Sequence, residues 1–174
     1  MQMLNRYFAP FALILILSAI WFNVESPLNW HTWEPSYRYA LAILAASMLV
    51  NWWFSANTYR FIRWSRQMKV LQVWMNFVWA VPLVYLLVPF WAPVWLLFVM
   101  APVTAALYMA WWSTLATALI SAGTLLLVYY LRNPLEGAVL GMALVHASFI
   151  VVFSLFVHSL AQAALRLRDA NLSN

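Results

Sequence analysis

Two of the three histidines, His146 and His158, lie in the last apolar block of the sequence, where an imidazole is well suited to bind a metal ion or a haem iron. They are twelve residues apart, which in a helix places them about 120° apart around the axis and about 18 Å apart along it. The two imidazoles therefore cannot bind one metal ion together. Either could be an axial haem ligand with a partner elsewhere, and a bis-histidine site would need His31 to fold back. The alternative is a histidine that forms a hydrogen bond between helices, and the sequence leaves both open.

Other groups that carry out catalysis are missing from the apolar blocks. The chain has no cysteine, which excludes disulfides, thiolate metal sites and cysteine nucleophiles. No Asp, Glu, Lys or Arg lies inside a predicted membrane span, and ion pumps, coupled transporters and retinal proteins need such groups there. We therefore predict no catalytic residue, no metal site and no cofactor, and we expect that this chain is not an enzyme.

Aromatic residues are the most unusual feature of the composition, at 18% of the chain with twelve tryptophans. Many fall where helices would enter the headgroup layer, as aromatic belts do. Those left over, together with one histidine, are typical of a pocket for a small, mostly apolar ligand. The predicted ligand-binding residues are Trp79, Trp91, Trp95, Tyr108, His146, Phe149 and Phe153. The alternative, also open, is that these side chains fill the core of a bundle or face lipid.

The elements that would hold these residues are membrane-spanning helices. Of the 174 residues, 67% are hydrophobic and 7% charged, with a mean hydropathy of +0.83, whereas soluble domains carry about 25% charge. The apolar blocks approach the roughly 20 residues that a helix needs to cross a bilayer, and they do not alternate in polarity as barrel strands do. We predict the all-α class, a polytopic transmembrane helical bundle of about six spans. The predicted spans are residues 8–22, 39–54, 70–87, 94–108, 112–131 and 138–162.

Basic residues orient the predicted bundle, because the cytoplasmic segments of membrane proteins are enriched in Lys and Arg. Seven of the nine lie in the two ends of the chain and in segment 60–69, and only Arg38 and Arg132 lie on the other side. Both termini are therefore predicted to be cytoplasmic. In segment 60–69 the basic residues recur at every third position, which predicts a short interfacial helix facing lipid phosphates. This placement accounts for the net charge of +5 and argues against a nucleic-acid partner.

Small and polar residues within the spans indicate contacts between helices. Gly123 and Gly141 would let helices approach closely, and Gly137 forms a Gly-x-x-x-Gly pattern with Gly141. Most of the polar span residues are expected to be packing contacts worth about 0.6 kcal/mol each. They are Ser47, Asn51, Gln72, Asn76, Thr104, Tyr108, Thr114, Thr117, Ser121, Thr124, Ser148 and Ser154.

The sequence after the last span stays helix-prone and contains Leu165 and Leu172 one heptad apart. A helix that leaves the membrane in this way is typical of a linker to an output domain. We therefore divide the chain into a six-helix transmembrane sensor domain, 1–162, and the start of a cytoplasmic linker helix, 163–174. We expect a homodimer that forms through the last helix and the linker.

Several motifs between residues 60 and 131 resemble those of a known receptor family. They are Trp64 within the basic run, Pro82 in Trp79-Ala-Val-Pro-Leu-Val-Tyr, and the pair Trp91 and Trp95. With six predicted spans, the chain resembles the membrane sensor region of quorum-sensing receptor histidine kinases of the α-hydroxyketone autoinducer type. The resemblance implies that aromatic residues of spans four and six line the ligand pocket. These would be Trp91, Trp95, Phe149 and Phe153.

The chain departs from that family because no phospho-acceptor histidine segment and no nucleotide-binding domain follow the last span. Signalling would then depend on a separate output part of the histidine-kinase or cyclase type. The predicted function is a multi-pass sensor of the cell inner (plasma) membrane that binds a small hydrophobic ligand and signals through its last helix. The alternatives are a haem- or quinone-binding redox protein, and a transporter or subunit of a membrane complex.

Overall fold

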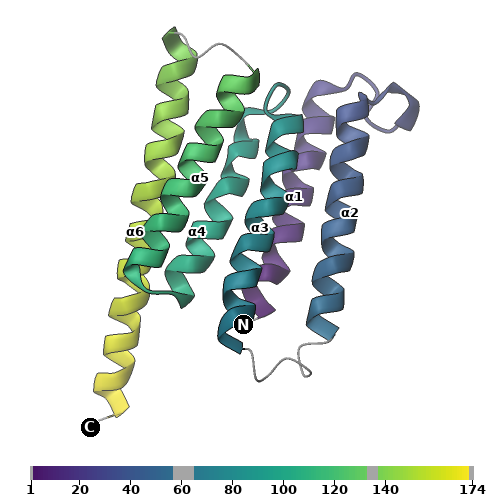
Figure 1. Cartoon of the computed structure of the whole chain (residues 1–174). Helices are drawn as coiled ribbons and strands as arrows, with labels where there is room; N and C mark the ends of the chain where they lie inside the picture. Colours follow the sequence, from purple (N-terminus) through teal and green to yellow (C-terminus); the bar gives the residue numbers. More distant parts are fainter. Residues whose placement is uncertain (1, 57–64, 133–136, 173–174) are drawn as a thin grey trace.

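The computed structural model describes residues 2–56, 65–132 and 137–172, and all regular secondary structure in these ranges is helical (Figure 1). The elements are α1 (Gln2–Asn23), η1 (Trp30–Thr32), α2 (Pro35–Ala56), α3 (Ser65–Leu87), η3 (Ala92–Leu96), α4 (Leu97–Tyr108), α5 (Trp111–Arg132) and α6 (Gly137–Leu172). The predicted all-α class is confirmed. Of the predicted interfacial helix at 60–69, the part up to residue 64 lies outside the described residues, and from Ser65 onward the chain already belongs to α3.

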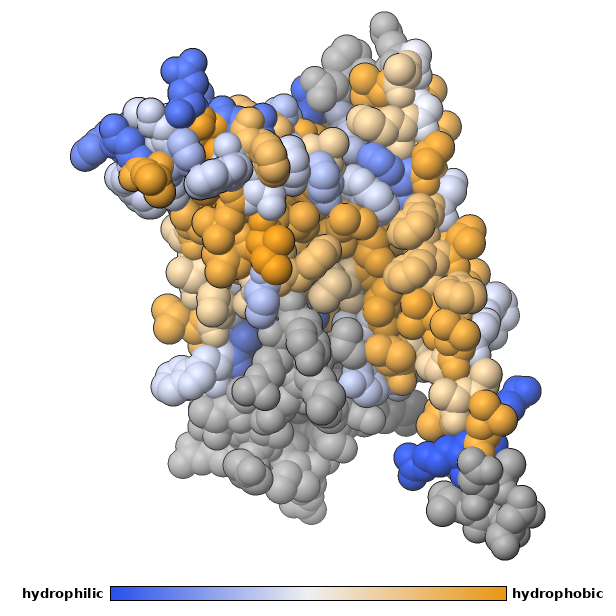
Figure 2. All heavy atoms as spheres, turned by 180° about the vertical axis from the view of Figure 1, so that it is seen from behind, coloured by the Kyte–Doolittle hydropathy of each residue, from blue (hydrophilic) through white to orange (hydrophobic). Residues whose placement is uncertain are grey.

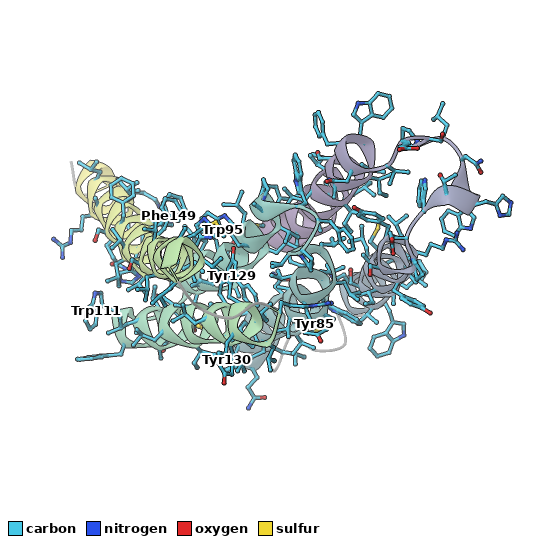
Figure 3. All side chains as sticks on the ribbon, turned by 90° about the horizontal axis from the view of Figure 1, so that it is seen from above. Tyr85, Trp95, Trp111, Tyr129, Tyr130 and Phe149 are labelled. Carbon is cyan, nitrogen blue, oxygen red and sulfur yellow. The ribbon has the colours of Figure 1, made fainter. Side chains whose placement is uncertain are left out.

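The helices run alternately up and down, so both termini lie at one end of the bundle (Figure 1). We call this the terminal end, and the opposite end, which carries Arg38 and Arg132, the distal end. Helices α4, α5 and α6 pack on one another, α3 joins them through α4, and α1 and α2 pack on α3. Seen from above, this gives a bundle that is longer than it is wide, with α6 and α2 at its two extremes (Figure 3). The large buried side chains lie on the faces between helices, among them Phe8, Leu44, Leu83, Phe98, Leu125 and Ile150.

Two of the described helices, α5 and α6, are long and apolar enough to cross a membrane. The apolar segments Phe8–Asn23, Val73–Leu87 and Ala92–Tyr108 are shorter. In the most apolar stretches of α5 and α6 only 39% and 22% of the residues are buried, whereas an apolar helix in a soluble protein is apolar because it is buried. Length and composition of these two helices therefore fit a membrane protein.

Proline sets the shape of the short fourth helix. Trp91 precedes the 3₁₀ helix η3 with an extended backbone, and Pro93 occupies its first turn, where a missing N–H does no harm. The chain then continues into α4, which is twelve residues long and contains Pro102. This arrangement brings Trp95 to the distal end of the bundle, next to α6.

Several hydroxyl groups of the helices are satisfied locally. The hydroxyls of Thr104, Thr114, Thr117, Thr124 and Ser154 all donate to the carbonyl oxygen four residues earlier. These hydrogen bonds satisfy the hydroxyl groups locally, so the side chains of Thr104, Thr114 and Ser154 are buried without an unpaired donor.

The glycine prediction is wrong for the described chain. A Cβ added at Gly123, Gly137 or Gly141 would meet no atom within 4 Å, so no helix approaches closely at these positions. Gly137 has a backbone φ of +50° at the start of α6, a left-handed conformation that glycine adopts readily. Its role is to begin the helix and not to pack against a neighbour.

The two distal arginines satisfy backbone carbonyls at that end of the bundle. Nη2 of Arg38 donates to the carbonyl oxygens of Trp30 and His31, at 3.0 and 3.1 Å, which fixes the loop between α1 and α2. Nε of Arg132 donates to the carbonyl oxygen of Tyr85 at 2.9 Å, and its guanidinium lies 4.0 Å from the centre of the Tyr85 ring. Arg38 thus makes local contacts within its own loop, whereas Arg132 links α5 to α3, 47 positions away in the sequence.

Candidate functional site

The candidate site is built on a stacked pair of rings, Trp95 of η3 and His146 of α6. Their ring centroids are 4.3 Å apart and their planes differ by 15°, which is an offset or parallel stack of the kind that aromatic side chains favour. Both side chains are half-buried. The contact joins positions 51 residues apart in the sequence and pins the distal half of α6 to the connection between α3 and α4.

Tyr129 of α5 adds a hydrogen bond to the same imidazole. Its hydroxyl lies 3.1 Å from Nδ1 of His146, and the tyrosine side chain is 2% exposed. When the imidazole carries its proton on Nε2, the Tyr129 hydroxyl donates to Nδ1. Nε2 then remains a donor, and within the described ranges the ring has no other hydrogen-bond partner.

Two phenylalanines extend the stack along α6. The Phe149 ring meets Trp95 edge to face at 5.5 Å, and Phe153 stacks on Phe149 at 5.2 Å with an angle of 11° between the planes. Positions 146, 149 and 153 share one face of a helix because they are three and four residues apart. We call Trp95, Tyr129, His146, Phe149 and Phe153 the ring cluster.

The ring cluster reaches the outer surface of the bundle. Trp95, Tyr129 and Phe149 lie together between η3, α5 and α6, whereas Tyr130 lies on the other long side (Figure 3). Phe149 is 44% exposed, so one side of the cluster is open while Tyr129 closes the other. An apolar molecule could contact the Phe149 and Trp95 rings without entering the interior of the bundle.

Four of the seven predicted ligand-binding residues therefore come together, namely Trp95, His146, Phe149 and Phe153. The other three lie elsewhere. Trp91 stacks on Phe22 of α1 with the ring centroids 5.3 Å apart. Trp79 packs against the main hydrophobic core from α3, and Tyr108 is the last residue of α4, at the terminal end.

Sequence reasoning missed Tyr129. It is the first residue of a Tyr-Tyr pair near the end of α5, where tyrosines are common as belt residues. Tyr130 fits that interpretation, because its side chain is 65% exposed. The difference between the two neighbours depends on the rotation of α5, which the sequence of an apolar helix does not reveal.

The second histidine of α6 is separate from the ring cluster. His158 is 6% exposed, and its Nδ1 lies 3.0 Å from the carbonyl oxygen of Ala106 in the last turn of α4. With its proton on Nδ1, His158 donates to that carbonyl. Among the described residues no group of three or more potential metal-binding side chains is found.

Beyond His158, α6 leaves the bundle. Every residue from Gln162 to Arg168 is exposed, and the helix projects past the other helices at the terminal end (Figure 1). The helix has 36 residues, which corresponds to a length of about 54 Å. It is unbroken across residue 162, so the predicted domain boundary falls inside a continuous helix.

Comparison with known proteins gives no relative for this chain. No protein-family model, no curated protein and no solved structure matches it.

Proposed function

We propose that this chain is the six-span membrane sensor domain of a signalling receptor, with both termini in the cytoplasm. Support comes from the alternating helices, which put the basic ends of the chain at the terminal end, in agreement with the enrichment of cytoplasmic segments in Lys and Arg. The low burial of α5 and α6 supports it as well. In water these surfaces would be a large apolar patch, whereas lipid covers them without cost.

The exposed side chains fit this placement. Val145, Val152 and Leu127 are more than half exposed, at 66%, 67% and 53%. On the face seen in Figure 2, an apolar zone lies between hydrophilic residues at the distal and terminal ends. A bilayer around the apolar zone would solvate these side chains and leave both ends in water. The inner (plasma) membrane is the location that goes with a cytoplasmic output domain.

The ligand proposed for the ring cluster is a small, mostly apolar molecule with one hydrogen-bond acceptor. The open rings of Phe149 and Trp95 offer apolar contact, and Nε2 of His146 offers one donor when Tyr129 holds the opposite nitrogen. Few polar groups among many apolar ones are typical of such sites. An α-hydroxyketone, the ligand class that the family resemblance implies, has alkyl chains for the apolar contact and a carbonyl oxygen that accepts a hydrogen bond.

The observation that carries the proposal is the continuity of α6. The same helix contributes His146, Phe149 and Phe153 to the ring cluster and then projects past the bundle without a break. A ligand that separates Trp95 from His146, or tightens their contact, would change the position of α6 relative to α4. Because a ligand shifts an equilibrium only through different contacts in two states, this ring contact is the proposed point of action.

Binding to the purified protein tests the proposal. A series of medium-chain α-hydroxyketones, alcohols and ketones is titrated into the detergent-solubilised chain by calorimetry, and the strongest binder is used with variants. We expect Trp95→Ala and Phe149→Ala to raise its Kd by about tenfold or more, since each removes a ring that contacts the ligand. Trp52→Ala is the matched control, because Trp52 is 70% exposed on α2, far from the ring cluster.

Three results would contradict the receptor hypothesis. They are the failure of every compound in the series to bind, an equal loss of affinity in Trp52→Ala, and a haem absorption band in the purified protein. The last would favour the redox alternative, with His146 as the iron ligand. Thermal unfolding of each variant shows that the fold is retained.

A further inference from the structure

One face of α6 combines polar side chains with a hollow at the terminal end. The hollow has a volume of about 610 Å³ and is lined by His158, Ser159, Gln162, Ala163, Arg166 and Leu167. Positions 158, 162 and 166 are four residues apart and lie within about 80° around the helix axis. We call Ser159, Gln162 and Arg166 the α6 polar face.

The α6 polar face is basic, and it has no ion pair with the side chains that the structure describes. Arg166 and Gln162 are exposed, and neither has an ion pair or hydrogen bond with another described residue. The lining of the hollow includes no acidic side chain among the described residues. The Arg166 guanidinium and the Gln162 side-chain amide are donors suited to the oxygens of a phosphate group, whereas the Ser159 hydroxyl already donates to the carbonyl oxygen of Leu155.

The position of this face along α6 matches the edge of a bilayer. Gly137 begins the helix at the distal end, and His158 is 21 residues further on, which corresponds to about 32 Å along the axis. A hydrocarbon core is about 30 Å thick. When Gly137 lies at one edge of the core, His158 and Ser159 lie at the other edge, and Arg166 extends about 10 Å further into the headgroup layer.

Apolar and polar groups also occur in the right order for a lipid. Phe156, 54% exposed, lies three residues before Ser159 and therefore on the membrane side of the face, where acyl chains would contact it. The basic group lies on the water side. Long basic side chains at such a position reach toward lipid headgroups.

From the hollow, its polar lining and its position at the edge of the bilayer, we infer that the α6 polar face binds the phosphate headgroup of an anionic phospholipid of the cytoplasmic leaflet. This inference rests on the membrane orientation in the proposed function, but not on a ligand at the ring cluster. A bound lipid would contact the helix at the point where it leaves the bundle. The lipid composition of the membrane would then affect the same helix that carries the signal.

Native mass spectrometry of the full chain in detergent tests this inference. Phosphatidylglycerol and phosphatidylcholine are added in equal amounts, and the chain with one bound lipid is quantified for each. We expect phosphatidylglycerol to be preferred, and Arg166→Gln to reduce that preference about fivefold, since one basic residue near a charged lipid surface contributes about this factor. Gln162→Leu should weaken binding of both lipids by removing the amide.

Arg168→Gln is the matched control. Position 168 is two residues after Arg166, so it lies about 200° around the helix and faces away from the hollow. The inference is supported when Arg168→Gln keeps the lipid preference. It is overturned when Arg168→Gln and Arg166→Gln have equal effects, or when the unaltered chain shows no preference between the two lipids. It is also overturned when the chain is a dimer that Arg166→Gln dissociates, because a second copy would then cover this face.

Failure of this test and failure of the receptor hypothesis are distinguishable. The lipid preference is measured without any ligand for the ring cluster, and the calorimetric titration is carried out in detergent without phospholipid. A chain that binds α-hydroxyketones but shows no preference for phosphatidylglycerol would leave the sensor hypothesis intact and overturn only the lipid site.

Discussion

Asn76 lies on α3 with 1% of its surface exposed, and neither Nδ2 nor Oδ1 of its amide has a hydrogen-bond partner in the described part of the chain. Buried amides without partners destabilise a fold, because the hydrogen bonds that they make in water are lost and not replaced. Most hydroxyl groups discussed above avoid this by donating within their own helix. Asn76 has no comparable acceptor or donor among the described residues.

Replacing Asn76 with leucine, a residue of similar size, should therefore stabilise the protein. We expect Asn76→Leu to raise the free energy of unfolding by on the order of 1 kcal/mol, since the unpaired amide is removed and apolar contact takes its place. Thermal unfolding of the detergent-solubilised protein measures the change. Thr104→Val is the control, because the Thr104 hydroxyl is buried but already satisfied by the carbonyl oxygen of Met100. A lower midpoint for Asn76→Leu would contradict the prediction and would mean that the amide has a binding partner.

The ring cluster illustrates how far residue types and spacing could predict the site. Positions 146, 149 and 153 form one helical face at sequence level, and the structure brings these side chains together. Trp95 was also among the predicted residues, but its contact with His146 could not be predicted. The two residues are 51 positions apart, so their contact depends on how η3 packs against α6. Residue type predicted Trp79 and Tyr108, and the family resemblance also implied Trp91, but all three side chains lie outside the ring cluster.

At the level of elements, the helices could be predicted well and their rotations could not. Helix ends follow from Pro, Gly and charged residues, so α5 at Trp111–Arg132 differs from the expected span by one residue at each end. Rotation is harder, because the buried and the outward faces of these helices are both apolar. Leu44 is 2% exposed and Leu49 67%, yet both are leucines on the same helix. The usual amphipathic signal is therefore missing.

A hydrogen bond joins α6 to the end of α4. The carbonyl oxygen of Ala106 lies in the last turn of α4, where carbonyl groups lack partners within the helix. His158 supplies the missing donor at 3.0 Å. It is also the last buried residue on α6 before the helix projects from the bundle, so it fixes the point from which the projection starts.

We expect His158→Leu to loosen the last turn of α4. Loss of one buried hydrogen bond of about 1 kcal/mol should raise the opening equilibrium, and with it the hydrogen exchange rate of that turn, by about fivefold. Exchange of the Met109 amide, which donates to Ala105, measures the effect by mass spectrometry of the corresponding peptide. In Ser159→Ala, the control, exchange should not change, because the Ser159 hydroxyl bonds only to Leu155 of its own helix. Unaltered exchange in His158→Leu would show that the contact does not hold the two helices together.

For the whole molecule, the decisive property is that chain ends and basic residues fall on one side. The six α-helices of the described chain alternate in direction, so Arg38 and Arg132 lie at the distal end and Arg166 and Arg168 lie at the terminal end. The predicted spans and the count of Lys and Arg on each side of them predicted this division. The flattened outline of the bundle was not predictable, because no sequence feature reports that α2 and α6 lie at opposite extremes (Figure 3).

The absence of cysteine makes the proposed orientation directly testable with single substitutions. Leu28, in the loop between α1 and α2, is 94% exposed, and Leu167, on the projecting part of α6, is 69% exposed. In intact cells a membrane-impermeant maleimide should modify the Leu28→Cys variant and leave the Leu167→Cys variant unmodified, because only the distal end faces outward in the proposed orientation. After lysis both variants should react, which controls for accessibility of the thiol. The reverse pattern in intact cells would invert the orientation and place the projecting end of α6 outside the cell. Modification of both variants, with the cells still intact, would mean that the two ends are not separated by a membrane.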